Sequence, residues 1–174
     1  MISGCQPAPI ESRLTRDTWI ITKAYFHGSE IELQRNAPLV LINRNGERYV
    51  TLHFAEDKRI DLPGLDAYSI PARWTFDGKQ IVFTIDTTYY NARVDGEKTL
   101  ELPLIFRNDS LALDSLRALR VQEVTSELNA LKQSFAIFEQ PFIVKELKKD
   151  ALTLQSRTTT IYAIRDNTLD NILP

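Results

Sequence analysis

The 174-residue chain carries 21 basic and 23 acidic side chains, a formal net charge of −2, and a single cysteine. This length predicts one domain with a substantial core, because a domain of this size buries roughly 70% of the surface of its unfolded chain. The acidic balance argues against a nucleic-acid partner. The absence of an apolar run of about 18 residues argues against a membrane-spanning helix, and a lone cysteine against an intrachain disulfide.

The N-terminal segment carries a short motif followed by prolines. Ile2-Ser3-Gly4-Cys5 resembles a bacterial lipoprotein box, in which the cysteine becomes the lipid-modified first residue of the mature protein. Residues 6–9 suit a tether between an anchor and a folded domain. We therefore interpret residues 1–13 as a lipobox remnant and tether, with Cys5 as the site of lipid attachment. The competing interpretation is a chance match at a frayed terminus.

Short apolar segments then alternate with turn signals. His27-Gly28, Asn45-Gly46 and Pro63-Gly64 are turn-forming pairs that separate these segments. The spacing predicts antiparallel strands over most of this region. The segments are residues 19–26, 30–34, 38–42, 48–54 and 59–62.

The clearest local signal is a β-hairpin over residues 68–87, YSIPARWTFDGKQIVFTIDT. Apolar and polar side chains alternate in both halves, as in half-buried strands. Asp77-Gly78 suits a type I′ turn with a two-residue loop. Pro71 lacks an N–H and therefore predicts an edge position, an unpaired N–H or a bulge. The predicted opposite pairs are Phe76–Lys79, Trp74–Ile81, Ala72–Phe83, Ile70–Ile85 and Tyr68–Thr87.

The apolar period changes in the second half of the chain. Residues 99–106 resume a strand pattern, and from residue 111 apolar side chains recur at about 3.6-residue spacing. N-cap candidates at 108–110 and Pro141 at the far end predict a helix over about 110–138. A helix of this length spans on the order of 42 Å. Because a small barrel is shorter, we expect a break near residues 121–125 or an overhang.

This helix has two interpretations. Its apolar stripe favours packing against the chain's own sheet. The second half, residues 121–138, also fits a heptad pattern, which would make the helix a partner-binding coiled coil. The candidate partner-contacting residues are Val124, Leu128, Leu131 and Phe135.

Strands return after Pro141. Residues 142–147 and 151–155 predict a second hairpin, in which the simplest register separates Phe142 from the face of Leu152 and so predicts a bulge. Residues 158–165 predict the last strand, and we expect the tail, residues 166–174, to be loose.

The order of these pieces resembles the lipocalin-like domains common in Bacteroidetes lipoproteins, within the calycin group. The residues that carry the resemblance are Trp19 at the first strand, the WTFDGKQIVF and FIVKELKKDALTLQ hairpins, and the final IYAIR strand. In that family a Gly-x-Trp motif opens the barrel and a late arginine packs on its tryptophan. Trp19 and Arg165 match these two roles, whereas Asp17 replaces the glycine. The resemblance implies a Trp19–Arg165 stack at the barrel floor, a cation–π contact of about 1 kcal/mol.

The resemblance implies a mainly all-β fold, an antiparallel up-and-down β-barrel of about eight strands that is lipocalin-like. The barrel would span residues 14–165, with one long amphipathic α-helix inserted within 109–139. A barrel of this size holds packed side chains or one small ligand. The candidate lining residues for a small hydrophobic or amphipathic ligand are Tyr68, Ile70, Trp74, Phe83, Ile85 and Tyr162. The alternative is that these residues form a filled core.

No motif predicts catalysis. The sequence lacks a GxSxG nucleophile motif and a glycine-rich phosphate loop, and His27 and His53 stand alone without metal-ligand spacing. We expect no enzymatic activity, no metal and no cofactor.

Two functional hypotheses remain. The first is a lipid-anchored protein of the bacterial cell envelope, on the outer membrane, that binds a small hydrophobic ligand in its barrel. The second is an envelope accessory protein with a filled barrel that binds a protein partner through helix 110–138 or a sheet edge. In both, the N-terminal lipid is the only contact with the membrane.

Overall fold

The computed structural model describes residues 9–34, 50–65, 69–88 and 110–166. The fold of this part is mainly β, as predicted, with two described helices, α1 (Ile10–Arg16) and α3 (Ser110–Phe138). The strands are β1 (Thr18–Phe26), β2 (Ser29–Ile31), β3 (Thr51–His53), β4 (Arg59–Leu62), β5 (Ile70–Phe76), β6 (Gln80–Ile85), β7 (Phe142–Leu147), β8 (Ala151–Gln155) and β9 (Thr159–Arg165).

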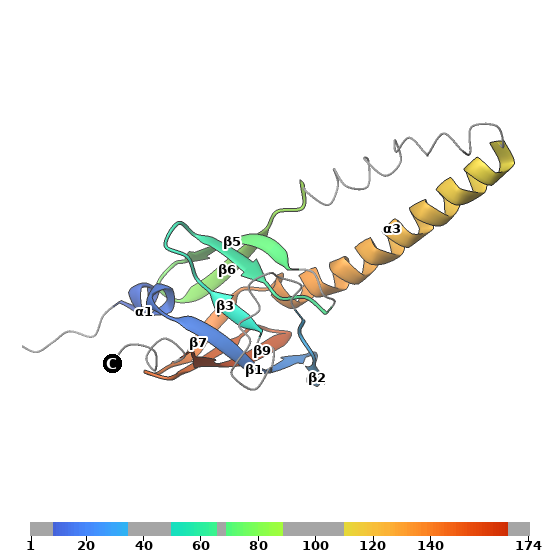
Figure 1. The fold of residues 1–174 in the computed structure, drawn as a ribbon. Coiled ribbons are helices and arrows are strands. Elements are labelled where there is room, and N and C mark those ends of the chain that lie inside the picture. The colour runs from blue at the N-terminus through green and yellow to red at the C-terminus, as the bar shows by residue number, and fades with distance from the viewer. Residues whose placement is uncertain (1–8, 35–49, 66–68, 89–109, 167–174) are drawn as a thin grey trace, which may run out of the picture.

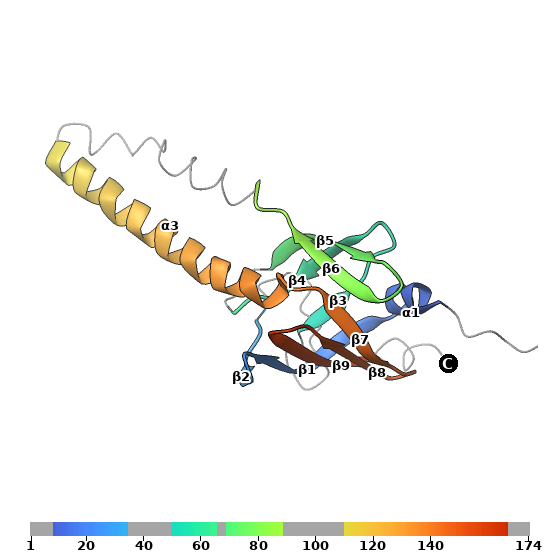
Figure 2. The same ribbon diagram turned by 180° about the vertical axis from the view of Figure 1, so that it is seen from behind.

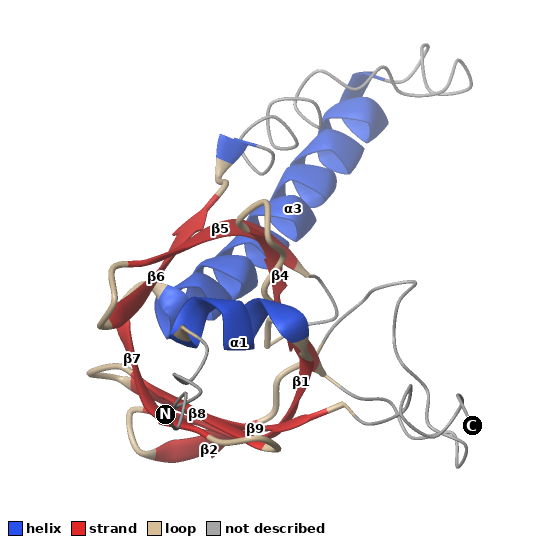
Figure 3. Cartoon of the chain, turned by 90° about the vertical axis from the view of Figure 1, so that its left-hand side faces the viewer, coloured by secondary structure: helices blue, strands red, loops and turns tan. Residues whose placement is uncertain are grey.

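The strands form one curled antiparallel sheet in the order β2-β1-β9-β8-β7-β6-β5-β4, with β3 paired to β1. Figure 3 shows the sheet curving around the core, with α1 in front and α3 behind. Strand β1 splits its second edge between two partners, since Trp19 lies opposite Leu52 of β3 and Tyr25 opposite Glu30 of β2. The architecture is a curled half-barrel.

Two backbone contacts bring the far strand, β4, back toward the first strands. In the turn between β3 and β4, the Ala55 amide donates to the Arg59 carbonyl at 3.2 Å. Gln34, beyond β2, and Gly64, beyond β4, exchange both backbone hydrogen bonds, at 2.7 and 3.0 Å. Hydrogen bonds therefore join the two edges of the sheet, beyond β2 on one side and beyond β4 on the other.

The β5–β6 hairpin is confirmed, but its predicted register is wrong by two residues. Trp74 lies opposite Phe83, not opposite Ile81. Gly78, with φ +92°, is the first central residue of the turn, and the Asp77 carboxylate accepts from the amides of Lys79 and Gln80. A positive φ at this position is typical of a type II′ turn. A two-residue shift keeps each side chain on its face, so the predicted inward set remains inward.

Pro71 lies inside β5, opposite Asp61 of β4, and β5 is not an edge strand. The carbonyl of Pro71 accepts from the amide of Asp86 at 3.1 Å, just past the end of β6. The missing N–H of Pro71 therefore falls where the β5–β6 ladder ends and removes only a terminal bond.

The predicted long helix is confirmed as a single element of 29 residues. It is continuous through residues 121–125, so the expected break is absent and the expected overhang is present: Figures 1 and 2 show α3 projecting away from the sheet. Only its last turns reach the core, through Phe135, Ile137 and Phe138.

Helix α1 was not predicted. Residues 10–13, assigned to a tether, belong instead to this seven-residue helix. Its one buried side chain is Leu14, whose carbonyl accepts from the indole Nε1 of Trp19 at 3.3 Å. The helix thus packs on the sheet at the end opposite α3.

The last three strands follow the prediction closely. The expected bulge is present, as a register shift between Val144 and Glu146 on β7. On β9, Ile161 and Ala163 are buried whereas Tyr162 and Ile164 are exposed. Cys5, Tyr68, the segments 38–42 and 99–106, and residues 167–174 of the tail lie outside the described residues.

Candidate functional site

Three of the predicted barrel-lining residues lie at the centre of the core. Ile70 and Trp74 of β5 are fully buried, and Phe83 of β6 nearly so. The Trp74 ring meets Phe54 edge-on, with centroids 5.2 Å apart, and its Nε1 donates to the Ala55 carbonyl at 3.0 Å. These side chains contact one another, as in a filled core.

An aromatic cluster extends this core toward α3. Phe83 contacts Phe138 of α3 at 5.8 Å and Phe142 of β7 at 5.6 Å between ring centroids, both edge-on. Phe138 and Phe142 are fully buried. Edge-to-face packing at these distances is the favourable geometry for aromatic pairs. The C-terminal turn of α3 therefore closes this end of the core with its own side chains.

The other two lining candidates that the structure describes differ from the prediction. Ile85 is only partly buried and lies at the rim of the core, toward α3. Tyr162 is 43% exposed on the outer face of β9, where its ring contacts Tyr25 of β1 at 6.1 Å. Tyr162 cannot line the interior, because strand alternation places its neighbours Ile161 and Ala163 there instead.

Charged side chains close the end of the sheet near α1. The Arg13 guanidinium donates to the Leu147 carbonyl, the last of β7, at 2.6 Å. Lys58 forms an ion pair with Glu11, and its ammonium group lies 4.1 Å from the centre of the Trp74 ring. Helix α1 is thus tied to both β7 and the β3–β4 turn.

Trp19 and Arg165 are directly opposite each other on β1 and β9. The Arg165 guanidinium lies 3.6 Å from a carboxylate oxygen of Asp17 and 3.6 Å from one of Asp150. Asp17 therefore supplies a counter-charge for Arg165. The stack of Arg165 on Trp19 stays a prediction.

Helix α3 has exposed side chains at most of the described positions in its N-terminal half. The described side chains from Asp114 to Glu123 are exposed, among them Leu116, Leu119 and Val121, with Leu119 at 59%. Among the partner-contacting candidates, Val124 and Leu131 are buried and Phe135 packs partly against the core. The side chain of Leu128 lies outside the described part. The exposed apolar positions therefore precede the predicted ones along the helix.

An apolar hollow of about 430 Å³ lies between β6 and the last turns of α3. Strand β6 contributes Phe83 and Ile85, two of the predicted lining residues, and α3 contributes one face. Its other lining residues are Thr84, Thr87, Lys132, Phe135, Ala136 and Glu139.

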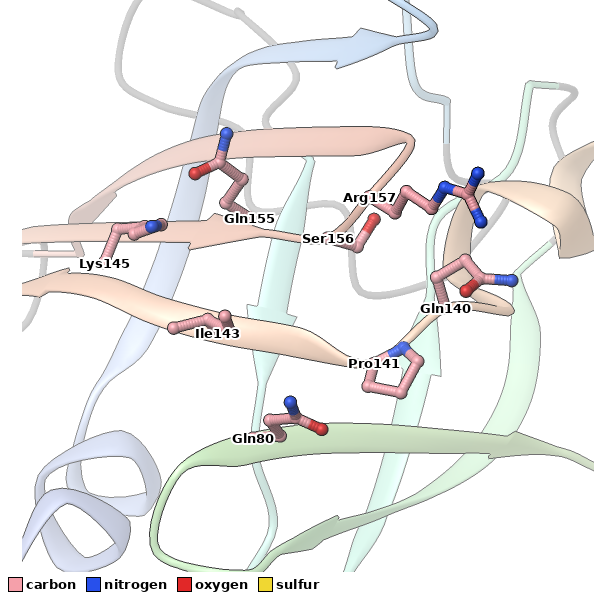
Figure 4. A pocket seen from close by; sticks show the side chains of 8 residues that line it. All are labelled: Gln80, Gln140, Pro141, Ile143, Lys145, Gln155, Ser156 and Arg157. Atoms are coloured by element: carbon pink, nitrogen blue, oxygen red, sulfur yellow. The ribbon is translucent and has the colours of Figure 1, made fainter.

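A second hollow, of about 380 Å³, lies on the outer face of β6, β7 and β8 (Figure 4). Lys145 and Arg157 give it positive charge, and Ile143 and Pro141 give it an apolar part. Figure 4 shows these side chains spread along three strands, with Lys145 and Arg157 at opposite sides of the view. The two charged side chains among its described lining residues, Lys145 and Arg157, are both exposed. This hollow is therefore an open surface depression, in which the described part of the chain places no buried polar group to hold a ligand.

Four of the described side chains have shifted pKa values, and the main cause in each case is a hydrogen bond to a neighbour in the same turn. Backbone amides of Gln80 and Lys79 lower the pKa of Asp77, and the backbone amide and guanidinium of Arg59 lower that of Asp57. A hydrogen bond from Lys148 lowers the pKa of Glu146, and the same bond raises the pKa of Lys148. Asp57, Asp77 and Lys148 are exposed and Glu146 is partly exposed, and all four lie in or beside turns.

The histidines lie apart. His27 is the first central residue of the β1–β2 turn, with φ +50°, and His53 Nδ1 lies 3.2 Å from the hydroxyl of Thr18. Within the described ranges, no group of three or more histidine, cysteine or acidic residues could hold a metal ion. No helix in the same ranges is long and apolar enough to cross a membrane.

Comparison with protein-family models, curated proteins and solved structures gave no match for this chain. Function is therefore inferred from the geometry of the described residues.

Proposed function

We propose that this chain is a non-catalytic, lipid-anchored protein of the bacterial cell envelope that presents α3 to a protein partner from a closed, lipocalin-like β-barrel. The observation that carries the proposal is the N-terminal half of α3, which projects from the sheet with Leu116 and Leu119 exposed. Exposed apolar side chains on a projecting element are typical of a contact surface.

The positions of α1 and α3 at opposite ends of the strands support a partner surface that points away from the lipid anchor. Helix α1, which follows the lipobox-like segment, packs where β7 and β9 end, since Arg13 bonds Leu147 and Asp17 pairs with Arg165. Helix α3 packs where the same strands begin, and its Ile137 carbonyl accepts from the Thr159 hydroxyl at 2.8 Å. An anchor at Cys5 would therefore place α3 on the side of the domain that faces away from the membrane.

A ligand inside the barrel has less support. The interior positions are occupied by Trp74, Phe83 and Phe138 packed edge to face with neighbouring rings. The hollow between β6 and α3, which Phe83 and Ile85 help to line, opens at the surface.

The spacing of the exposed apolar residues on α3 suggests what kind of partner surface they fit. Leu116 and Leu119 are separated by about 60° around the helix, because successive residues turn by about 100°. A pair at i and i+3 presents a narrow apolar ridge, which suits the groove of a partner helix or helix pair.

A photo-crosslinking amino acid at Leu119, in cells of the source bacterium, tests the partner. We expect one crosslinked protein that disappears when Leu116→Lys is added to the probe-bearing chain and persists when Thr125→Lys is added instead. Thr125 is exposed and lies on the opposite side of the helix from Leu116, so it is a matched control. Loss of the crosslink in both variants, or in neither, would overturn the proposal.

The anchor needs a separate measurement. We expect the mass of the N-terminal peptide from membrane-purified protein to include acyl chains on Cys5. An unmodified Cys5 would contradict the lipid anchor. The partner surface on α3 would then be judged by the crosslinking result alone.

A further inference from the structure

Strands β6 and β7 are staggered. Their ladder contains only Gln80–Ile143 and Ile81–Phe142. Beyond Phe142 the chain turns at Pro141 into α3, so residues 82–85 of β6 extend past their neighbour. The sheet therefore has an interior gap at the end where α3 packs.

The backbone of this overhang faces the gap at every second residue. The Asp77–Gln80 and Pro71–Asp86 bonds show which pairs of the β5–β6 ladder are hydrogen bonded, and by alternation Phe83 and Ile85 point their N–H and C=O groups away from β5. Within the part of the chain that the structure describes, these amides have no backbone partner. They repeat at about 6.8 Å, twice the rise of a strand residue.

The hollow of about 430 Å³ lies directly beside this edge. Its opposite wall is one face of α3, formed by Lys132, Phe135, Ala136 and Glu139, whose spacing of i, i+3, i+4 and i+7 places them in one row. Apolar side chains thus occupy the middle of the row, and a positive and a negative charge occupy its two ends.

We infer that the overhanging edge of β6 binds an extended peptide, which adds a strand between β6 and α3. Only an extended main chain offers carbonyl and amide groups at the repeat of Phe83 and Ile85, the basis of strand addition. The peptide carries an apolar side chain over Phe135 and Ala136, an acidic residue toward Lys132 and a basic residue toward Glu139. This site is separate from the projecting half of α3 and stands whether or not that surface binds a partner.

A phage-displayed library of random eight-residue peptides tests the site on the full chain. We expect enriched sequences in which apolar residues alternate with other residues, and an acidic and a basic residue on either side. Their affinity should fall about tenfold or more in Ile85→Pro, which removes the edge amide without removing a bond to β5. Ile85→Val keeps the amide and should bind as the parent chain does.

A second variant protects the result against misfolding of Ile85→Pro. Ala136→Trp fills the hollow from the helix side and should also abolish enrichment, while circular dichroism shows the parent helix content. Equal enrichment on the parent chain and on both variants would overturn the inference. So would an absence of enriched peptides combined with binding of the apolar dye N-phenylnaphthylamine that survives Ile85→Pro, which would assign the hollow to a small apolar ligand.

Discussion

The two ends of the curled sheet are closed by different means. At the α1 end, a short helix contributes one buried side chain, Leu14, and a set of charged contacts: Arg13 to Leu147, Glu11 to Lys58 and Asp17 to Arg165. At the α3 end, the closure is aromatic, through Phe138 against Phe83 and Phe142.

The stagger of β6 and β7 explains this difference. It leaves β6 overhanging toward α3 and β7 overhanging toward α1. The guanidinium of Arg13 binds the last carbonyl of the β7 overhang, whereas the β6 overhang has no such contact among the described residues. At the α1 end the overhanging strand is therefore bonded by Arg13. At the α3 end the edge of β6, unpaired within the described residues, lies beside the hollow.

The largest expected effect is on the aromatic end. Phe138→Ala should lower the free energy of unfolding by about 3–5 kcal/mol, because it removes a fully buried ring and leaves a cavity. Urea denaturation followed by tryptophan fluorescence measures it. Leu14→Ala is the matched change at the α1 end, with an expected loss of about 2–5 kcal/mol. A loss below about 1 kcal/mol for Phe138→Ala would show that α3 does not close the core.

A smaller effect is expected from the Arg13 contact. Arg13→Ala should lower the free energy of unfolding by about 1.5 kcal/mol, because a partly buried charged hydrogen bond to Leu147 is lost. Arg16→Ala is the control, since Arg16 pairs with its neighbour Asp17 on the surface and should change stability by less than about 0.5 kcal/mol. Equal losses in the two variants would contradict a specific role for Arg13.

The hairpin turn near α1 gives a pH-dependent effect. Since amides of Gln80 and Lys79 lower the pKa of Asp77, its stabilising contribution is complete above about pH 4 and is lost as the pH falls through the lowered pKa. Asp77→Asn keeps an acceptor oxygen without titrating. We expect its melting temperature to fall less than that of the parent between about pH 5 and pH 2. Parallel curves for the two proteins would rule out this contribution.

The smallest effect is expected at the projecting half of α3. Leu119→Lys should change the free energy of unfolding by less than about 0.5 kcal/mol, because Leu119 is largely exposed. Chemical denaturation with circular dichroism at 222 nm gives the value. A loss near that of Phe138→Ala would mean that this half of α3 belongs to the folding core, and would count against a contact surface there.

Sequence periodicity predicted the second half of the fold closely. The bounds of α3, β7 and β8 match, because Pro141 separates a 3.6-residue period from a two-residue period. The bulge on β7 was predicted because Phe142 and Leu152 could otherwise not share a face. Both residues are buried.

Other features left no signal in the sequence. Helix α1 is too short to show a period and buries only Leu14. The β5–β6 register was misassigned because Asp77-Gly78 and Gly78-Lys79 are both acceptable turn centres and both keep the same faces inward. Both faces of β9 carry apolar residues, so alternation alone could not decide whether Ile161 or Tyr162 points inward. The position of Ile85 at the rim of the core depends on how α3 packs.

The site residues that sequence reasoning missed are polar. Ser134 of α3 is fully buried, and its hydroxyl oxygen accepts from the Leu65 amide at 2.9 Å; Thr159 of β9 is buried as well and donates to Ile137. For Ser134, the sequence offers one indication of burial: a serine among apolar residues in the last turns of the helix.

These two hydrogen bonds make α3 act as a lever arm. They fix the helix at two points close to its C-terminal end, one on the loop after β4 and one on β9, while the rest of its 29 residues has the length of a long arm. A tilt of about 10° at that root would carry the far tip by roughly 7 Å over about 40 Å of helix. Strain arriving at either β9 or the β4 loop would thus be magnified at the tip.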